Sequence, residues 1–157
     1  MSILILGLGN ELIADDAVGI LTARHLRALL DGEIEVIESG LSGIALIELF
    51  AGHERAIVID AIHTGQRPPG TIREFDSTDL GPVLSPSPHY SGLPEILALA
   101  RQLEVDFPSE IKIFAVEAAD MTTIGGQISA SVADVIPQLV DRIVLQIRDW
   151  QRQKTHA

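Results

Sequence analysis

Short apolar runs, each followed directly by glycine or an acidic residue, constrain the fold of this sequence more than any other feature. Residues 3–6 are aliphatic and precede Gly7, and residues 56–59 are aliphatic and precede Asp60. Runs of this length are typical of strands that are buried on both faces. Amphipathic segments with helical spacing lie between the runs. This alternation of strand and helix predicts right-handed crossovers and a mostly parallel sheet.

The expected elements cover most of the chain. Strands are expected at residues 3–6, 33–37, 56–59, 71–75 and 111–116. Helices are expected over residues 16–30, 42–51, 91–104 and 132–147, and Pro137 predicts a kink or a late start in the last of them. The predicted architecture is α/β, a three-layer sandwich in which a mostly parallel twisted sheet of about five strands is covered by helices on both faces. We expect one domain over residues 1–157, with a frayed polar tail at 151–157.

Composition excludes several classes of function. The absence of cysteine removes disulfides, thiolate metal sites and cysteine proteases. The 22 acidic and 11 basic residues give a net charge of −11, which disfavours nucleic acid and anionic membranes as partners. The apolar stretch at residues 2–8 is too short to span a bilayer, and no positively charged segment precedes it. We expect a cytoplasmic protein, and nothing in the sequence requires more than a monomer.

Three candidate site positions follow predicted strands or lie in loops. Asp15-Asp16 comes after the first strand, Asp60 follows the third, and His89 ends a Ser- and Pro-rich connection at residues 76–88. Ligands bind at the carboxyl ends of strands in open α/β sheets, so these side chains are expected at one edge. Carboxylates and imidazole suit a first-row divalent ion such as Ni²⁺ or Zn²⁺.

Each of these residues also has a structural explanation. Asp15 or Asp16 can cap the following helix, and we expect one of the pair to cap and the other to be functional. Asp60 can be a structural carboxylate bonded to loop amides, and a single histidine such as His89 is commonly structural or exposed. The combination of the three, rather than any one of them, favours a site.

Familiar catalytic and binding motifs are incomplete. Gly7 and Gly9 open a dinucleotide-binding fingerprint, but Leu12 stands where its third glycine would allow close helix packing. Glu38 could still bind a ribose hydroxyl, so a nucleotide-binding module stays open as an alternative. The HExxH pattern that begins at His53 fails at residue 57, and the GxSxG pattern that begins at residue 40 fails at residue 44.

Three blocks of the sequence resemble the nickel–iron hydrogenase maturation proteases. Residues 7–19, GLGNELIADDAVG, closely resemble that family's amino-terminal signature G-x-G-N-x-L-x-x-D-[DE]-x-x-G. Asp60-Ala61 with residues 69–71 matches its D-A…P-G-T segment, and residues 87–89 with 92–93 match its S-x-H…G-L segment. The three blocks occur in the same order as in the family.

The resemblance implies a cytoplasmic endopeptidase that removes a carboxy-terminal extension from the hydrogenase large-subunit precursor after nickel insertion. It places the family's catalytic and metal-contacting residues at Asp16, Asp60 and His89. In this family the nickel is held by the nickel-loaded precursor, so no permanently bound metal is expected. The resemblance does not identify a nucleophile, and water is the default because no serine or threonine has a paired base. Backbone amides of residues 7–10 and 40–43 are expected to approach the substrate, and the 76–88 loop to grip it.

Two alternatives to this function stay open. One is a metal-dependent amidohydrolase that keeps its own metal and acts on another peptide. The other is a non-catalytic module that binds a nucleotide or a metal.

Overall fold

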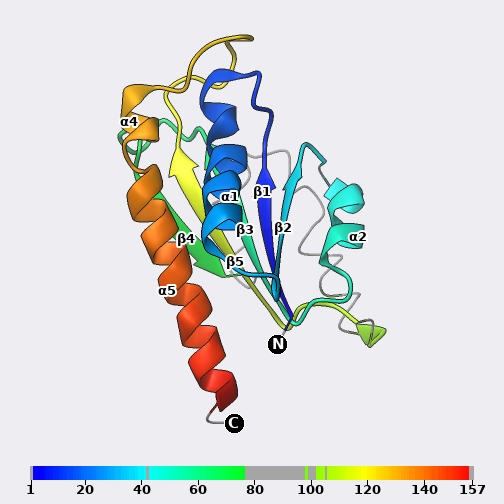
Figure 1. The fold of residues 1–157 in the computed structure, drawn as a ribbon. Helices are drawn as coiled ribbons and strands as arrows, with labels where there is room; N and C mark the ends of the chain where they lie inside the picture. Colours follow the sequence, from blue (N-terminus) through cyan, green and yellow to red (C-terminus); the bar gives the residue numbers. More distant parts are fainter. Residues whose placement is uncertain (1, 42, 77–97, 99–101, 105, 156–157) are drawn as a thin grey trace.

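A five-stranded mixed sheet forms the centre of the molecule (Figure 1). The computed structural model describes residues 2–41, 43–76, 98, 102–104 and 106–155. The strand order is β2-β1-β3-β5-β4. The strands are β1 (Ile3–Leu8), β2 (Ile34–Ser39), β3 (Arg55–Ile62), β4 (Ile72–Asp76) and β5 (Glu110–Glu117). All neighbouring pairs are parallel except β4 and β5, which confirms the predicted α/β class with a mostly parallel sheet.

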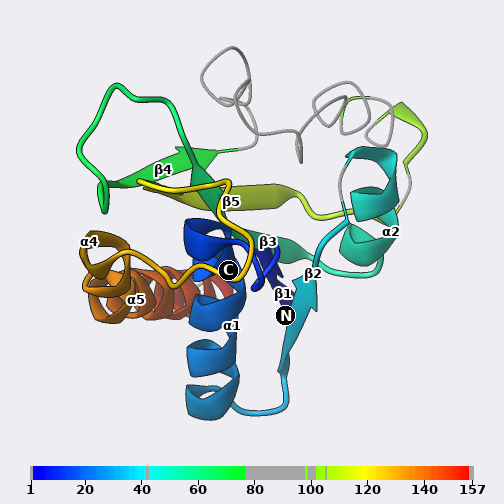
Figure 2. The same ribbon diagram turned by 90° about the horizontal axis from the view of Figure 1, so that it is seen from above.

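Helices cover both faces of this sheet. The helical elements are the 3₁₀ turns η1 (Ala14–Ala17) and η2 (Gly43–Leu46), with α1 (Val18–Leu29), α2 (Ile47–Phe50), α4 (Ala130–Ala133) and α5 (Ile136–Thr155). Helices α1 and α5 lie side by side on one face (Figures 1 and 2), and α2 packs against the other. Among the described residues, no helix has both the length and the apolar character needed to span a bilayer.

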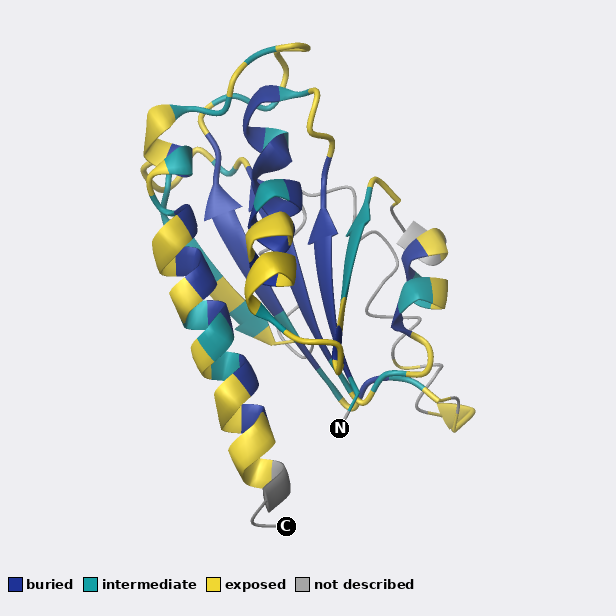
Figure 3. Cartoon of the chain, in the orientation of Figure 1, coloured by how far each residue is buried: buried dark blue, intermediate teal, exposed yellow. Residues whose placement is uncertain are grey.

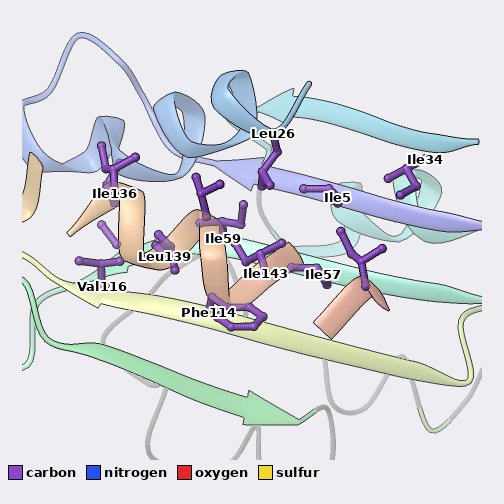
Figure 4. Packing of buried hydrophobic residues seen from close by; sticks show 14 of the residues in the cluster. Ile5, Leu26, Ile34, Ile57, Ile59, Phe114, Val116, Ile136, Leu139 and Ile143 are labelled. Atoms are coloured by element: carbon purple, nitrogen blue, oxygen red, sulfur yellow. The ribbon is translucent and has the colours of Figure 1, made fainter. Parts of the chain in front are cut away.

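The core is divided into two clusters because successive residues of a strand point to opposite faces. In β1, Ile3 and Ile5 join the cluster under α1 and α5, whereas Leu4 and Leu6 join the cluster under α2. Figure 4 shows the first cluster, in which Phe114 of β5 and residues of α5 meet the central strands. Burial is complete along β1 and nearly complete along β3, while β2 at the sheet edge is partly exposed (Figure 3). Burial of the central strands therefore fixes the frame on which the loops are mounted.

Several boundaries differ from the sequence-based expectation. Helix α5 begins at Ile136, so Pro137 occupies its first turn, where the missing amide proton costs nothing. The late start is thus confirmed. The same helix continues to Thr155, beyond the expected boundary at 151, because Trp150 is buried and the Gln153 amide bonds the Asp149 carboxylate at 3.2 Å. Most of the helix expected at 91–104, and residues 77–88 of the Ser- and Pro-rich loop, lie outside the described residues.

Strands β2 and β3 lie on opposite sides of β1, so the strand order has a switch point between β1 and β3. From β1 the chain passes to β2 on one side, and it then returns to β3 on the other side. Such a switch point leaves a crevice at the carboxyl ends of the two strands. Gly19 lets α1 approach this point closely, since a Cβ atom there would lie 2.4 Å from the carbonyl oxygens of both Leu8 and Ile59. The close packing that the missing glycine at position 12 was expected to prevent is therefore provided by position 19.

Candidate functional site

Asp16 lies at the switch point, in the turn η1 that joins β1 to α1. The backbone N–H of Asn10 donates a hydrogen bond to Asp16 Oδ2 at 2.9 Å. Gly9 makes this contact possible because its φ of +140° suits glycine and because a Cβ atom there would lie 2.0 Å from the Asp16 carbonyl oxygen. The glycine turn after β1 thus holds the Asp16 carboxylate in one place.

A pocket of about 390 Å³ opens beside Asp16. It is lined by residues of the β1–η1 loop, of α1 and of the end of β2, namely Gly9, Asn10, Glu11, Asp16, Ile20, Glu38, Ser39 and Gly40. The carboxylates of Glu11 and Glu38 are paired with arginines of α1. Arg24 bonds both Glu11 at 2.8 Å and Glu38 at 3.0 Å, and Arg27 bonds Glu38 at 2.6 Å. Arg24 also lowers the pKa of Glu11 below its usual range.

These ion pairs bear on the nucleotide-binding alternative. That alternative requires the Glu38 carboxylate for a ribose hydroxyl. In the structure the two oxygens of this carboxylate are engaged by Arg24 and Arg27. The geometry of the pocket therefore gives the nucleotide-binding module no support.

Asp15, the neighbour of Asp16, has a different role. Its carboxylate is fully buried and accepts hydrogen bonds from the backbone N–H groups of Ala119, Asp120 and Ser129 at 2.6–2.8 Å, and from the Ser129 hydroxyl at 2.9 Å. Burial acts to raise the pKa of Asp15, but these hydrogen bonds outweigh it and hold the pKa below its usual value. Asp15 therefore fastens the 119–129 loop to the turn that carries Asp16.

The expectation that one member of the Asp15-Asp16 pair caps the helix is wrong. The N-cap positions of η1 and α1 are Ile13 and Ala17, and neither makes a side-chain capping bond. The buried turn is also strained, because Ala14 has a φ of +30°, a left-handed conformation that costs an L-residue about 1 kcal/mol. The hydrogen bonds of Asp15 hold this conformation in place.

Asp60 lies near the end of β3, between its two neighbouring strands. Its side chain is fully buried, and Oδ1 accepts the backbone N–H of Ala61 at 2.8 Å. The residue before it, Ile59, contacts the first turn of α1 through its carbonyl oxygen. The structure therefore brings Asp16, in the turn after β1, and Asp60, near the end of β3, to the same edge of the sheet.

The third predicted residue, His89, lies outside the described residues. Among the residues that are described, no three His, Cys, Asp or Glu side chains are grouped so that they could hold a metal ion. The proposed trio needs His89 for its imidazole, so its geometry remains a prediction. Two carboxylates at one sheet edge are consistent with the oxygen part of a divalent cation site.

Two backbone N–H groups of the loop between β1 and η1 donate hydrogen bonds to other groups of the protein. The Gly9 N–H donates to the Ser39 carbonyl at 3.1 Å, and the Asn10 N–H is bonded to Asp16. We expected amides of the 7–10 turn to approach a substrate strand, and for these two residues the structure contradicts this. They hold the site together instead.

Two residues that hold the loops of this edge in place were missed in the sequence. Glu117 is buried at the end of β5, where its carboxylate accepts the Thr64 N–H at 2.8 Å, the Thr64 hydroxyl at 2.5 Å and the Gly65 N–H at 3.3 Å. The rule that selected Asp60, an acid directly after an apolar strand, also applies to Glu117. Ser129, which bonds Asp15, carries no comparable signal because its partner is 114 residues away.

Comparison with known proteins identifies relatives of this chain. The model of the family described as hydrogenase maturation protease matches residues 20–146. The chain is 27% identical over 153 residues to the hydrogenase 2 maturation protease of Escherichia coli K12, covering 95% of this chain and 92% of that protein. It is 29% identical over 153 residues to the hydrogenase expression/formation protein HupD of Rhizobium leguminosarum, covering 94% and 75%. The solved structure of the hydrogenase maturating endopeptidase HybD from E. coli superimposes with a TM-score of 0.81 at 26% identity, covering 95% of this chain and 93% of that one.

Proposed function

The chain belongs to the hydrogenase maturation protease family and is a peptidase, and we propose that it removes the carboxy-terminal extension from the large-subunit precursor of a nickel–iron hydrogenase. We propose further that it acts on the precursor only after nickel has been inserted. The nickel then belongs to the substrate, and the enzyme needs no permanently bound metal.

One observation carries this proposal. Asp16 and Asp60 stand at the carboxyl ends of β1 and β3, at the point where the sheet topology leaves a crevice. Asp16 lines a pocket between the β1–η1 loop, α1 and the end of β2, and its position is fixed by the Asn10 N–H. A held carboxylate at a crevice is a suitable contact for a substrate that carries a divalent cation.

The ligand set suits recognition of a metal that is already bound elsewhere. Asp16 and Asp60 would offer carboxylate oxygens and His89 an imidazole nitrogen, and such a set leaves room for ligands from the precursor. Nickel in this position supplies a Lewis acid that polarises a carbonyl group. A precursor without nickel lacks the cation that these residues contact, so selectivity follows from the enzyme's own incomplete site.

The residues of the chain would also handle the proton of the attacking water. A carboxylate or imidazole within hydrogen-bond reach can accept this proton and deliver it to the leaving amine. Asp16, Asp60 and His89 are the candidates for this step. The hydrogen bond from the Asn10 N–H holds the Asp16 carboxylate in position for this step.

The test is processing of the precursor. Purified protein is incubated with nickel-loaded and with nickel-free large-subunit precursor, and the product mass is measured. We expect cleavage of the nickel-loaded form alone, and a loss of more than about 100-fold in kcat/KM for Asp16→Asn, Asp60→Asn or His89→Ala. Asp31→Asn, at an exposed carboxylate beyond the end of α1, is the matched control and is expected to process normally.

The alternatives predict other results. Cleavage of the nickel-free precursor at the same rate, together with metal in the purified protein, would favour a metal-dependent amidohydrolase. Full processing by any two of the three site variants would contradict the proposed assignment of the trio. Unchanged melting temperatures of the variants are required for either conclusion.

A further inference from the structure

Exposed apolar side chains lie in or beside the loops that line the pocket containing Asp16. Leu12 directly follows the pocket residue Glu11 and is 64% exposed, and Leu41 directly follows the pocket residue Gly40 and is 45% exposed. Ile124, in the 119–129 loop, is 81% exposed. We refer to Leu12, Leu41 and Ile124 together as the apolar rim.

Backbone contacts connect Leu12 to the loop of Ile124, and a hydrogen bond connects Leu41 to the end of β2. The Gly125 N–H donates to the Leu12 carbonyl at 2.6 Å, and Ile13 forms a β-bridge with Ile124, so Leu12 and Ile124 belong to interlocked loops. On the other wall, the Leu41 N–H donates to the Ser39 hydroxyl at 3.0 Å, and the Ser39 carbonyl accepts the Gly9 N–H. The rim is therefore continuous with the walls of the pocket.

The backbone of the rim is held in position before any partner binds. The Asp15 carboxylate fastens both ends of the 119–129 loop, and the Leu12 N–H is bonded to the Asn10 side chain at 2.9 Å. Apolar side chains on a rigid backbone lose little conformational freedom on binding, so more of their burial is converted into affinity. A single exposed apolar side chain has no special meaning, but three of them beside one pocket can form a contact surface.

The charge of the same loops restricts the partner. Residues 9–16 and 119–129 contain no lysine or arginine, and three of their acidic side chains, Glu11, Asp16 and Asp120, are at least partly exposed, whereas Asp15 is buried. Arg24 of α1 neutralises part of this charge through its ion pair with Glu11. Hydrogen bonds from the Thr123 and Thr122 groups lower the pKa of Asp120 to about 2, so it stays charged at neutral pH. This surface disfavours phosphates and anionic lipid, and it suits a polypeptide with apolar side chains and a neutral or positive charge.

We propose that the apolar rim binds the extended stretch of the hydrogenase large-subunit precursor next to its scissile bond. This inference rests on the proposed function, because Leu12 and Leu41 directly follow residues that line the pocket beside Asp16. Apolar side chains of that segment pack against the rim, and the rim thereby contributes to substrate binding and not to the chemical step. The rim determines the class of sequence that is accepted around the cleavage site.

The test separates binding from chemistry. The variants are Leu12→Ser, Ile124→Ser and the double variant, and Leu145→Ser is the matched control because Leu145 is 59% exposed on α5, away from the pocket. With nickel-loaded precursor we expect each rim variant to raise KM by roughly 5- to 20-fold, and the double variant by more, with kcat within about twofold of the wild type. The control keeps the wild-type KM, and all four proteins keep the wild-type melting temperature because the replaced side chains are exposed.

Each other outcome has a definite meaning. Rim variants with the KM of the wild type, or a control with the same rise in KM, would overturn the role of the rim while leaving the proposed function intact. A wild-type protein that leaves the precursor uncut would overturn both. A second copy of the chain is the other possible occupant of the rim, and sedimentation of the same proteins tests for it. A wild-type dimer that is lost in Ile124→Ser would assign the rim to dimer formation and contradict the proposal.

Discussion

The two ends of the sheet hold their charged groups in different ways. At the carboxyl edge, at the top of Figure 1, the buried Asp15 and Glu117 accept hydrogen bonds mainly from backbone N–H groups of loops that are distant in sequence. At the amino edge, side chains pair with side chains, as in Arg55–Glu110 at 3.2 Å and His53–Glu35 at 3.0 Å. A backbone donor cannot move unless its loop moves, whereas a side-chain donor can rotate away. The buried carboxylates of the edge that carries the candidate site are therefore preorganised, whereas Glu11 and Glu38 of the same edge are held by arginine side chains.

The strongest test of this difference is Asp15→Ala. The substitution leaves three backbone N–H groups and the Ser129 hydroxyl without their acceptor in a buried position, and we expect the free energy of unfolding to fall by about 3 kcal/mol. Urea unfolding followed by circular dichroism measures this loss.

Asp15→Asn provides the matched comparison for that variant. The amide can accept some of the bonds, but its NH₂ group must face a donor, so we expect only partial recovery of stability. A wild-type unfolding curve for Asp15→Ala would show that the 119–129 loop is held by other contacts.

Glu117→Ala tests the second carboxylate of the same edge. Its removal deprives the Thr64 and Gly65 N–H groups and the Thr64 hydroxyl of their acceptor. We expect a loss of about 2 kcal/mol, smaller than for Asp15, because Thr64 is only partly buried and water can replace part of the contact. In Glu117→Gln the amide can donate to the Thr64 hydroxyl, so stability should return close to the wild type, and equal losses in both variants would contradict the hydrogen-bond explanation.

Glu110→Gln tests the amino edge. The substitution removes the ion pair with Arg55 and keeps the size of the side chain. The Glu110 side chain is 42% exposed and the Arg55 side chain is 23% exposed. Exposed pairs of this kind contribute little, so we expect a change of less than about 0.5 kcal/mol in the free energy of unfolding. A loss comparable to that of Asp15→Ala would remove the distinction between the two edges.

The smallest expected effect is a pH dependence at Asp120. Its pKa is lowered to about 2 in the folded protein, from 3.8, by the Thr123 and Thr122 groups. A depressed carboxyl pKa stabilises the fold above the unfolded-state pKa, and this contribution is lost as the pH falls from about 4 through 2. We expect the difference in melting temperature between wild type and Asp120→Asn to shrink over that range, and a constant difference would contradict the assignment.

The sequence predicted the architecture because the central strands are buried on both faces. The apolar runs at residues 3–6 and 56–59 each lie within an observed strand, and their alternation with helical segments implied the parallel pairs. The antiparallel placement of β4 did not follow, since its residues are partly exposed and their pattern does not specify direction. The end of α5 was also missed, because its last turns are polar and are held by tertiary contacts of Trp150.

The site could be predicted only in part, for a related reason. Asp16 and Asp60 were found because they follow strands whose carboxyl ends share an edge. The division of roles between Asp15 and Asp16 depends on donors more than 100 residues away, which no local pattern contains. The role of His89 remains a prediction, since it depends on a segment that lies outside the described residues.

The bond between Asp15 and Ser129 has a consequence for synthesis of the protein. Its two partners are 114 residues apart, so this contact cannot form on the ribosome until most of the chain has emerged. The turn that presents Asp16 thus receives its final fastening late in translation. A truncated nascent chain that ends before residue 129 would lack this hydrogen bond, and the candidate functional site would be completed only in the nearly finished polypeptide.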